Sequence, residues 1–338
     1  MSASIILGIE SSCDDTSAAI ISGSKILSNI AANQAIHNEY GGVVPELASR
    51  AHQQNIIPVV EKAFSKANIQ QNDICAIGFT RGPGLLGSLL VGTSFAKSLA
   101  MSLNVPLIEV NHLQAHILAH FIDDANPKPP TFPFLCLTVS GGHTMIVLVK
   151  DYFEMEIIGK TIDDAAGEAF DKIGKIFDLD YPAGPIIDKL AKEGNPDAFQ
   201  FNKPRMENYD YSFSGIKTSV LYFIQKEVRK NPDFIKENLK DLCASVQRSI
   251  IEILMNKLEK ASVDLNIKDV AIAGGVSANS ALRKAMELNH EKLGWNIFIP
   301  KFEYTTDNAA MIAIVAKLKY ERGEFTDIRT TATAKYDL

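Results

Sequence analysis

Two stretches of the chain share one pattern of apolar and polar positions. Residues 5–21 read as an apolar run, a short polar turn and a second apolar run. Residues 134–149 repeat that order around the turn at 140–142. Short apolar runs bounded by small polar residues predict β-strands. We therefore expect one strand–turn–strand unit in each half of the chain.

A second pattern also occurs once in each half. Residues 73–100 and 269–286 each lead from an apolar run through a glycine-containing turn into a segment with helical periodicity. The same two units in the same order predict a duplicated α/β domain. The simpler alternative is that such units recur in any α/β protein.

The expected domain borders follow from this duplication. We predict a first domain over residues 1–125 and a second over 130–300, because the Pro-rich segment 127–133 is a natural link between them. A helical pattern at about 308–320, within a segment of about 305–325, follows the second domain. We expect this helix to cross back and join the first domain.

Composition sets limits on the class of protein. A chain of 338 residues is long for a single core, and 46% hydrophobic with 22% charged residues is typical of a soluble globular protein. The net charge of −6 gives no general support for nucleic-acid binding. The N-terminal apolar run is too short for a signal peptide or a membrane span, and the four cysteines form no CxxC pair. We expect free thiols and a cytoplasmic location.

A pair of histidines, His112 and His116, is the sharpest chemical signal. On a helix, residues four apart share a face and rise by about 6 Å, which allows two imidazoles to bind one ion. His120 extends the stripe but would lie about 12 Å from His112, too far to share that ion. A metal site also needs a third ligand, so surface or cleft histidines remain an alternative. A metalloprotease of the HExxH type is excluded, because Leu113 follows His112 where that motif has glutamate.

Glycine-rich turns are the second signal. Ser140-Gly141-Gly142 allows backbone N–H groups to approach phosphate oxygens, and residues 274–279 lead into a helix whose N-terminus is expected to offer unpaired donors. Residues 181–185 form a rigid turn. None of these is a Walker A or a Rossmann motif. Each alone is an ordinary tight turn, but together they favour a nucleotide in the crevice between the two domains.

An acidic run at 163–171 is the third signal. Asp164, Glu168 and Asp171 are spaced i, i+4 and i+7, which predicts that they share one helical face. The alternative is a solvated helix start with acidic residues at its positive end. Beside a nucleotide, such carboxylates would bind ribose hydroxyls or metal-bound water.

These motifs belong to a longer series of blocks that resembles a known family across nearly the whole chain. The blocks are GIESSCDDT (8–16), GGVVPELASR (41–50), TRGPGLLGSLLVG (80–92), NHLQAH (111–116), VSGGHT (139–144), DDAAGEAFDK (163–172), LDYPAGP (179–185), SFSGIKT (212–218), AGGVSAN (273–279) and TDNAAMIA (306–313). In content and order they resemble the tRNA adenosine threonylcarbamoyltransferase family, called TsaD in bacteria. The resemblance implies the two-domain actin/hexokinase/Hsp70-like (ASKHA) fold with an interdomain nucleotide cleft. It also implies transfer of threonylcarbamoyl from threonylcarbamoyl-AMP to the exocyclic amine of the adenosine 3′ of the anticodon, in tRNAs reading codons that begin with A.

The resemblance also assigns residues where the motifs match. It makes His112, His116 and Asp307 the ligands of one divalent metal, for which Fe²⁺ is the first expectation and Zn²⁺ the second. It implies a further set of positions that bind the adenylate: Thr138, Val139, Ser140, Gly141, Gly142, Asp171, Gly184, Asp188 and Asn279. The implied partners are tRNA, the paralogous actin-like subunit TsaB and the small ATPase TsaE, with no membrane. Asp14 and Glu168 fall in matched blocks without an assigned role.

The chain departs from the family pattern at few places. Asp15 stands where the family often has glutamate, Ala183 stands where a second glycine is common, and the tail at 330–338 matches poorly. Two other functions share the fold: an ATP-dependent small-molecule kinase and a non-enzymatic ATPase switch. The histidine pair is foreign to the first. The second would need a peptide-binding or polymer-forming surface.

Overall fold

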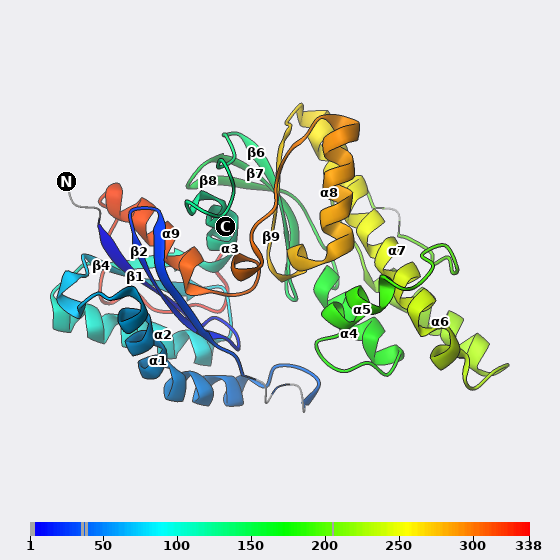
Figure 1. The fold of residues 1–338 in the computed structure, drawn as a ribbon, viewed down its shortest axis with the longest axis horizontal. Helices are drawn as coiled ribbons and strands as arrows, with labels where there is room; N and C mark the ends of the chain where they lie inside the picture. Colours follow the sequence, from blue (N-terminus) through cyan, green and yellow to red (C-terminus); the bar gives the residue numbers. More distant parts are fainter. Residues whose placement is uncertain (1–3, 35–36, 38–39, 205) are drawn as a thin grey trace. The chain divides into compact units, whose positions relative to one another are not determined.

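The first sheet is built from the N-terminal third of the chain in the computed structural model, which describes residues 4–34, 37, 40–204 and 206–338 (Figure 1). Its strand order is β3 (Lys25–Ala32), β2 (Thr16–Ser22), β1 (Ile5–Glu10), β4 (Ala76–Gly82) and β5 (Leu107–Asn111). The pairs β1·β2 and β2·β3 are antiparallel, whereas β1·β4 and β4·β5 are parallel.

The second sheet repeats this plan. Its order is β8 (Glu154–Lys160), β7 (Thr144–Asp151), β6 (Phe134–Val139), β9 (Asp269–Ala273) and β10 (Asn296–Phe298). The first two pairs are again antiparallel and the last two parallel. Every strand of one sheet therefore has a counterpart in the other, and the predicted duplicated α/β fold is confirmed.

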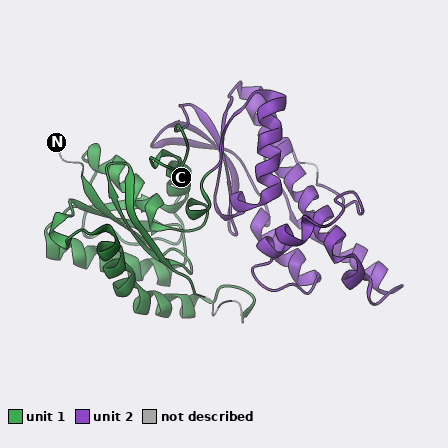
Figure 2. Cartoon of the chain, in the orientation of Figure 1, with its two compact units in different colours: residues 1–129, 300–338 green, residues 130–299 purple. Residues whose placement is uncertain are grey.

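The described chain divides into two compact units (Figure 2). Unit 1 comprises residues 1–129 and 300–338, and unit 2 comprises residues 130–299. Unit 1 is thus discontinuous in the sequence, and its last helix comes from the segment after unit 2.

Helices cover both faces of the unit 1 sheet. On one face α1 (Pro45–Ala67) and α2 (Leu86–Leu103) pack against strand residues such as Ile9 and Phe79. Side chains alternate between faces along a strand, so Gly8 and Gly78 face the other side. There α9 (Ala309–Glu321) approaches so closely that a Cβ at Gly8 would lie 2.6 Å from the Ala309 carbonyl oxygen.

In unit 2, helices surround a core whose largest buried side chains include Trp295, Tyr211 and Phe170. The helices are α4 (Ala166–Ile176), α5 (Ala183–Ala191), α6 (Ser214–Val228), α7 (Phe234–Leu265) and α8 (Ser280–Leu293). Short 3₁₀ turns occur at Gln71–Asp73, Ala119–Phe121, Gly275–Ala278 and Phe302–Tyr304.

Three helices end in the same way. Asn68, Asn104 and Asn266 have positive φ values of 54°, 52° and 52°. An apolar residue follows each of them, and its N–H bonds back to the helix, as Val105 N does to the Ala100 carbonyl at 3.1 Å. Asparagine tolerates the left-handed conformation, and the apolar residue then packs on its own helix. This junction turns α2 directly toward β5, the strand that leads to the histidine pair.

Helix α2 has the length and apolar composition that a membrane span requires, and it is the one such helix in the part of the chain that the structure describes. It packs on β4 and α1. A core helix of a soluble protein passes the same test. The four cysteines are free thiols, as predicted.

Candidate metal centre

The histidine pair stands on α3 (His112–Leu118), which begins directly after β5. Asn111 is its N-cap, and its Oδ1 accepts from Leu113 N at 2.9 Å and Gln114 N at 3.2 Å. An asparagine at this position satisfies donors that the first helical turn leaves without a partner. The turn is therefore fixed at the strand end, and both imidazoles are buried.

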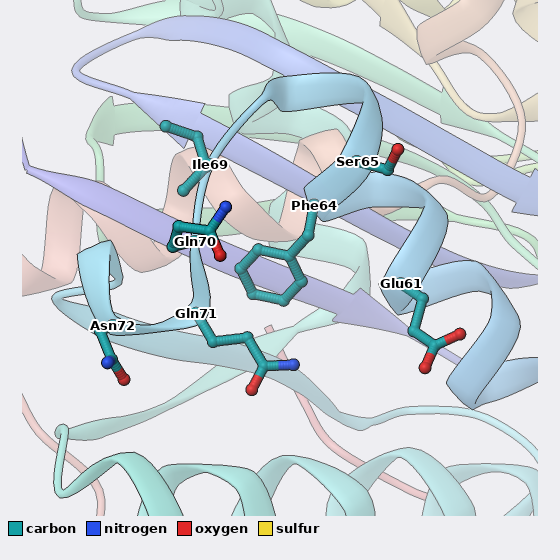
Figure 3. Close-up of a pocket in the computed structure, with 7 residues that line it drawn as sticks. All are labelled: Glu61, Phe64, Ser65, Ile69, Gln70, Gln71 and Asn72. Carbon is teal, nitrogen blue, oxygen red and sulfur yellow. The ribbon is translucent and has the colours of Figure 1, made fainter.

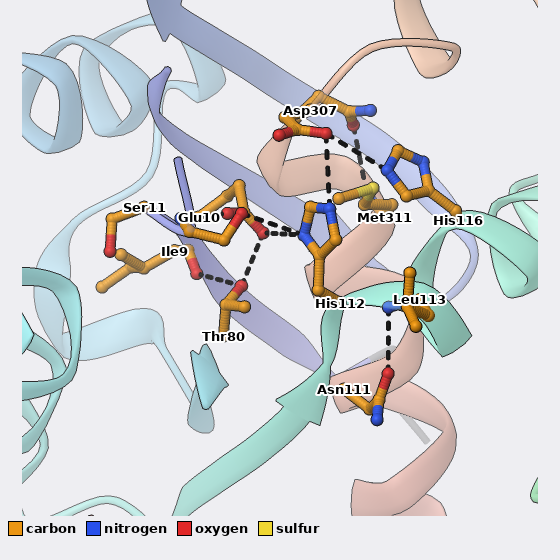
Figure 4. Close-up of polar contacts among 12 residues, drawn as sticks. Ile9, Glu10, Ser11, Thr80, Asn111, His112, Leu113, His116, Asp307 and Met311 are labelled. Atoms are coloured by element: carbon orange, nitrogen blue, oxygen red, sulfur yellow. Dashed lines mark hydrogen bonds and ion pairs between the residues drawn. The ribbon is translucent and has the colours of Figure 1, made fainter. Parts of the chain in front are cut away.

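Asp307 meets the two histidines from the start of α9. Its Oδ1 lies 3.2 Å from His116 Nε2 and 3.4 Å from His112 Nε2 (Figure 4). One donor atom from each of the three residues lies within 4.8 Å of the others. Ligands about 2.1 Å from a tetrahedral ion stand about 3.4 Å apart, so the two distances to Asp307 and the donor types suit one divalent metal.

Glu10 orients His112 from the opposite side. Its buried carboxylate Oε2 accepts from His112 Nδ1 at 3.1 Å and from the Thr80 hydroxyl at 2.6 Å (Figure 4). Its Oε1 accepts from Ser12 N at 2.5 Å. In the neutral imidazole with its proton on Nδ1, the Nε2 lone pair faces Asp307. Histidines that bind metals typically make such an outer hydrogen bond to a carboxylate.

The charges of the cluster favour a cation. Burial alone would raise the pKa of the Asp307 carboxyl, but His112 and His116 outweigh it and hold that pKa well below its usual value. Burial alone would lower the pKa of His112, but Asp307 and Glu10 raise it well above the usual value. Two carboxylates thus flank one imidazole, and either a proton or a divalent ion balances them.

The loop after β1 brings further acidic groups to the candidate metal centre in unit 1. The Cys13 carbonyl accepts from His52 Nε2 and from the Ser88 hydroxyl, both at 3.0 Å. Burial, followed by the charges of Asp14, Asp307 and Glu10, raises the pKa of Asp15 to about 7. Helices α1 and α2 therefore hold the backbone that carries Asp14 and Asp15.

His120 lies apart from this cluster. It belongs to the 3₁₀ turn after α3, and its Nδ1 contacts Asn126 Nδ2 at 3.0 Å. The metal-competent group in the described residues contains only His112, His116 and Asp307. This agrees with the predicted separation of His120 from His112.

The turn at 140–142 lies in unit 2, between β6 and β7, where Thr138 and Val139 are fully buried strand residues. Gly141 and Gly142 are exposed, and a Cβ added to either would meet no atom within 4 Å. Neither the chain's own packing nor a positive φ requires glycine here. Gly167, at the start of α4, does pack closely on the turn, since its Cβ would lie 2.6 Å from the Ser140 carbonyl oxygen.

The remaining adenylate candidates connect the starts of two helices. Asp171 Oδ1 accepts from Ala183 N at 2.8 Å, and the neighbouring Gly184 N–H also bonds its carboxylate, at the start of α5. Asp188 Oδ1 accepts from Ser280 N at 3.1 Å and from its hydroxyl at 2.7 Å. These carboxylates therefore cap α5 and α8.

Asn279 completes the cap of α8. Its Oδ1 accepts from Ala281 N and Leu282 N, and its Nδ2 donates to Gln247. The prediction of unpaired donors at this helix start is therefore wrong, because Asp188 and Asn279 take the N–H groups of residues 280–282. Gly274 is also required structurally, since a Cβ there would lie 2.5 Å from the Val139 carbonyl oxygen.

The predicted shared face of the acidic run is wrong for Asp164. Helix α4 begins only at Ala166, because the Thr161 hydroxyl bonds the Asp164 carbonyl and Thr144 Oγ1 accepts from Ala166 N. Lys172 still reaches both Asp164 Oδ1 at 2.7 Å and Glu168 Oε1 at 2.9 Å.

Comparison with known proteins decides the family. The sequence model of TsaD, described as tRNA N6-adenosine threonylcarbamoyltransferase, matches residues 25–314. The tRNA N6-adenosine threonylcarbamoyltransferase of Riemerella anatipestifer is 83% identical over 338 residues, covering 100% of this chain and 99% of the relative. That of Christiangramia forsetii is 62% identical over 331 residues, covering 98% and 97%. The chain belongs to the TsaD family.

The TsaD chain is thus an enzyme of the transferase class, and the kinase and ATPase-switch alternatives are not favoured. Its likeness to solved structures shows the fold alone. The ROK hexokinase from Thermus thermophilus is 13% identical, with a TM-score of 0.50, over 94% of this chain and 100% of that chain. The predicted actin/hexokinase-like class is confirmed.

Sequence reasoning missed the residues around the candidate metal ligands of this TsaD chain, among them Glu10, Thr80 and His52. Glu10 carried a usable signal, because a carboxylate at the end of a buried apolar strand needs a partner. Thr80 and His52 carried no such signal, because only the fold brings them to the cluster.

A pocket of about 460 Å³ at the end of α1 contains none of the predicted site residues (Figure 3). Its lining is Glu61, Phe64, Ser65, Ile69, Gln70, Gln71 and Asn72. This lining offers one carboxylate, one hydroxyl and three side-chain amides, and no histidine or cysteine, so it does not resemble the candidate metal centre.

Proposed function

We propose that this chain transfers the threonylcarbamoyl group from threonylcarbamoyl-AMP to the N6 amine of the adenosine 3′ of the anticodon, in tRNAs that read codons beginning with A. The observation that carries the proposal is the convergence of His112, His116 and Asp307 in a chain of the TsaD family. The reaction belongs in the cytoplasm, with its tRNA substrate.

The three donors are proposed to hold one divalent ion. Two imidazoles and one carboxylate leave open positions, and this ligand set suits Fe²⁺ first and Zn²⁺ second. When bound, the ion supplies Lewis-acid polarisation of an acyl or phosphate oxygen. Glu10 keeps the Nδ1 proton on His112 and so maintains the tautomer that the ion needs.

The donor substrate is a mixed anhydride and already carries its leaving group. The N6 lone pair forms a bond to the carbamoyl carbon, the bond from that carbon to the phosphate oxygen breaks, and AMP leaves with the electron pair while the amine loses a proton. The protein's task is to position the two substrates and stabilise the charge that grows on oxygen.

The turn of Ser140, Gly141 and Gly142 is proposed to receive the adenylate phosphate. The two glycines are exposed and have open space beside their Cα atoms. Backbone N–H groups without a covering Cβ are suited to phosphate oxygens. Asp171, Gly184, Asp188 and Asn279 are proposed to shape the same site, through the α5 and α8 starts that they hold.

Partner proteins are proposed to supply part of the tRNA surface. The chain has net charge −6, and its basic residues cluster only locally, as at 226–230 and 283–284. Binding of a polyanion depends on several neutralised phosphates. TsaB and TsaE are the proposed partners.

The test measures the modified nucleoside directly. The purified metal-loaded chain with TsaB, TsaE and threonylcarbamoyl-AMP should convert a tRNA reading an A-starting codon, detected by mass spectrometry of its nucleosides. A tRNA reading other codons is the matched control. Unchanged threonylcarbamoyladenosine in tRNA from cells depleted of this protein would overturn the proposal, and phosphorylation of a small molecule would favour the kinase alternative.

A further inference from the structure

The C-terminal segment 326–337, here called the strap, returns along the unit 1 sheet. It first pairs with β5: Thr326 N donates to the Leu107 carbonyl at 2.8 Å, and Glu109 N donates to Thr326 Oγ1 at 2.7 Å. The strap therefore lies beside the strand that ends at Asn111.

The strap next crosses the end of β4. Thr333 N donates to the Arg81 carbonyl at 2.9 Å, and Gly84 N donates to the Ala334 carbonyl at 3.2 Å. A Cβ at Gly82 would lie 2.1 Å from the Thr333 carbonyl oxygen, so this approach requires glycine. The part of the sequence that matched its family poorly is thus closely packed on a block that matched well.

Side chains fix the last part of the strap. Tyr336 donates its hydroxyl to Glu109 Oε1 at 3.0 Å, and the Arg81 guanidinium lies 4.8 Å from the centre of the Tyr336 ring. Arg81 also pairs with both oxygens of Glu109, at 3.0 and 3.1 Å. Tyr336 is therefore anchored to both β4 and β5.

The strap ends at Asn111, the N-cap of α3. Asn111 Nδ2 donates to the carbonyls of Asp337 at 2.8 Å and Tyr336 at 3.3 Å. The Oδ1 of the same amide accepts from Leu113 and Gln114 at the start of α3. One side chain therefore joins the C-terminal segment to the helix that carries His112 and His116.

We infer that Asn111 is a positioning residue through which the strap orients α3 and its two histidines. The inference rests on the proposed metal site. Helix α3 has only seven residues, and so short a helix is not stable without tertiary support. Metal ligands must be held to within about half an ångström. The four hydrogen bonds of Asn111 fix the amide and, with it, the first turn of α3.

Asn111→Asp separates the two contacts of this side chain, because it keeps the cap on α3 and removes the hydrogen bonds to the strap. Aspartate caps a helix as well as asparagine does, but it places an oxygen where the amide donated to the Tyr336 and Asp337 carbonyls. A chain ending at Lys335 removes both carbonyls, and Leu338→Ala keeps them as the matched control. Cobalt titration of the metal-free chains should give a Kd raised about 10-fold for the first two variants, at the lower end of outer-shell effects, and unchanged for the control.

The double variant tests whether the strap acts through Asn111. Within the chain ending at Lys335, Asn111→Asp should add little further loss, because the partners of the amide are already gone. If the two changes reduce cobalt affinity independently, so that their losses add in the double variant, the inference is overturned. So would a Kd within about twofold of the parent in both single variants.

Hydrogen exchange of the metal-free protein gives a readout independent of any ion. The amides of Leu113 and Gln114 should exchange faster in the chain ending at Lys335, while amides in α2 stay as protected as in the parent. Unchanged exchange at both positions would overturn the inference. Failure of the proposed metal site has a different result: a His116→Ala chain that binds as much cobalt as the parent.

Discussion

Glu10 and His112 stand 102 positions apart in the sequence, and their side chains meet at 3.1 Å. Glu10 ends the central strand of the unit 1 sheet, and His112 begins the short helix after its edge strand. The sheet thus sets the orientation of an imidazole whose other nitrogen faces Asp307. The geometry of the candidate metal centre depends on the alignment of strands rather than on the histidine motif alone.

Glu10→Gln should weaken metal binding by about 10- to 100-fold. A neutral amide raises the basicity of His112 less than a carboxylate does, and it can also present a donor to Nδ1. Isothermal titration with Zn²⁺ measures the effect. Thr80→Val is the control, since it removes only a hydroxyl that donates to Glu10. A Glu10→Gln chain with the parental Kd would show that this contact does not orient the ligand.

Alanine at His112, His116 or Asp307 should each remove most of the bound metal and the transferase activity while leaving the fold largely intact. A site with three protein ligands loses its affinity when one ligand is removed. Metal content per chain is measured by mass spectrometry after dialysis. His120→Gln, on the same stretch but outside the cluster, should keep its metal, and a fully loaded His116→Ala chain would contradict the assignment.

Gly141→Val should sharply reduce binding of the adenylate and leave the metal in place. A Cβ at this position meets no other atom of the chain within 4 Å, so we expect the fold to be kept and the loss to reflect the ligand. Adenylate titration with a parallel thermal melt separates the two effects. Wild-type affinity in this variant would make the turn a plain strand connection.

Asp163→Ala should destabilise the protein by about 1–2 kcal/mol at neutral pH, as loss of a helix cap does. Its carboxylate accepts from Ser212, Phe213 and Ser214 at the start of α6. Burial opposes ionisation, but these hydrogen bonds outweigh it and lower the pKa of Asp163.

The sign of the pH dependence follows from that lowered pKa. The folded chain stabilises the ionised form of Asp163 relative to the unfolded chain. The contribution of this carboxylate to folding stability is therefore complete above the ordinary aspartate pKa of about 4 and is lost as the pH falls below it. Denaturant melts from pH 7 to pH 3 should show parent and Asp163→Ala converging in acid. Glu156→Gln, in an exposed pair with Lys150, should follow the parent, and a constant gap for Asp163→Ala would contradict the prediction.

The isolated chain should bind tRNA weakly at near-physiological salt, because its net charge is −6. Adding TsaB and TsaE should tighten binding and steepen its salt dependence. Filter binding at several salt concentrations measures both. Tight, strongly salt-dependent binding and multiple turnovers by the lone chain would mean that a local basic patch suffices.

Local pattern predicted the repeated strands and the histidine pair, because each depends on neighbours in the sequence. Asp307 entered only through the family resemblance, since no spacing relates it to His116, 191 positions away. Asp164 was misplaced because a hydroxyl from Thr161 delays the helix that its spacing suggested. Glu10 and the strap were missed because their partners are set by the sheet and not by periodicity.

The discontinuity of unit 1 has a consequence during synthesis. The strands of its sheet leave the ribosome before unit 2, but α9, which covers one face of that sheet, leaves it after unit 2. All of unit 2 is translated in between and is complete in sequence before its neighbour can close. Asp307 arrives with α9, so the nascent chain holds the two histidines without this carboxylate until unit 2 has been translated. An ion that needs all three donors would therefore find them together only after all of unit 2 has been made.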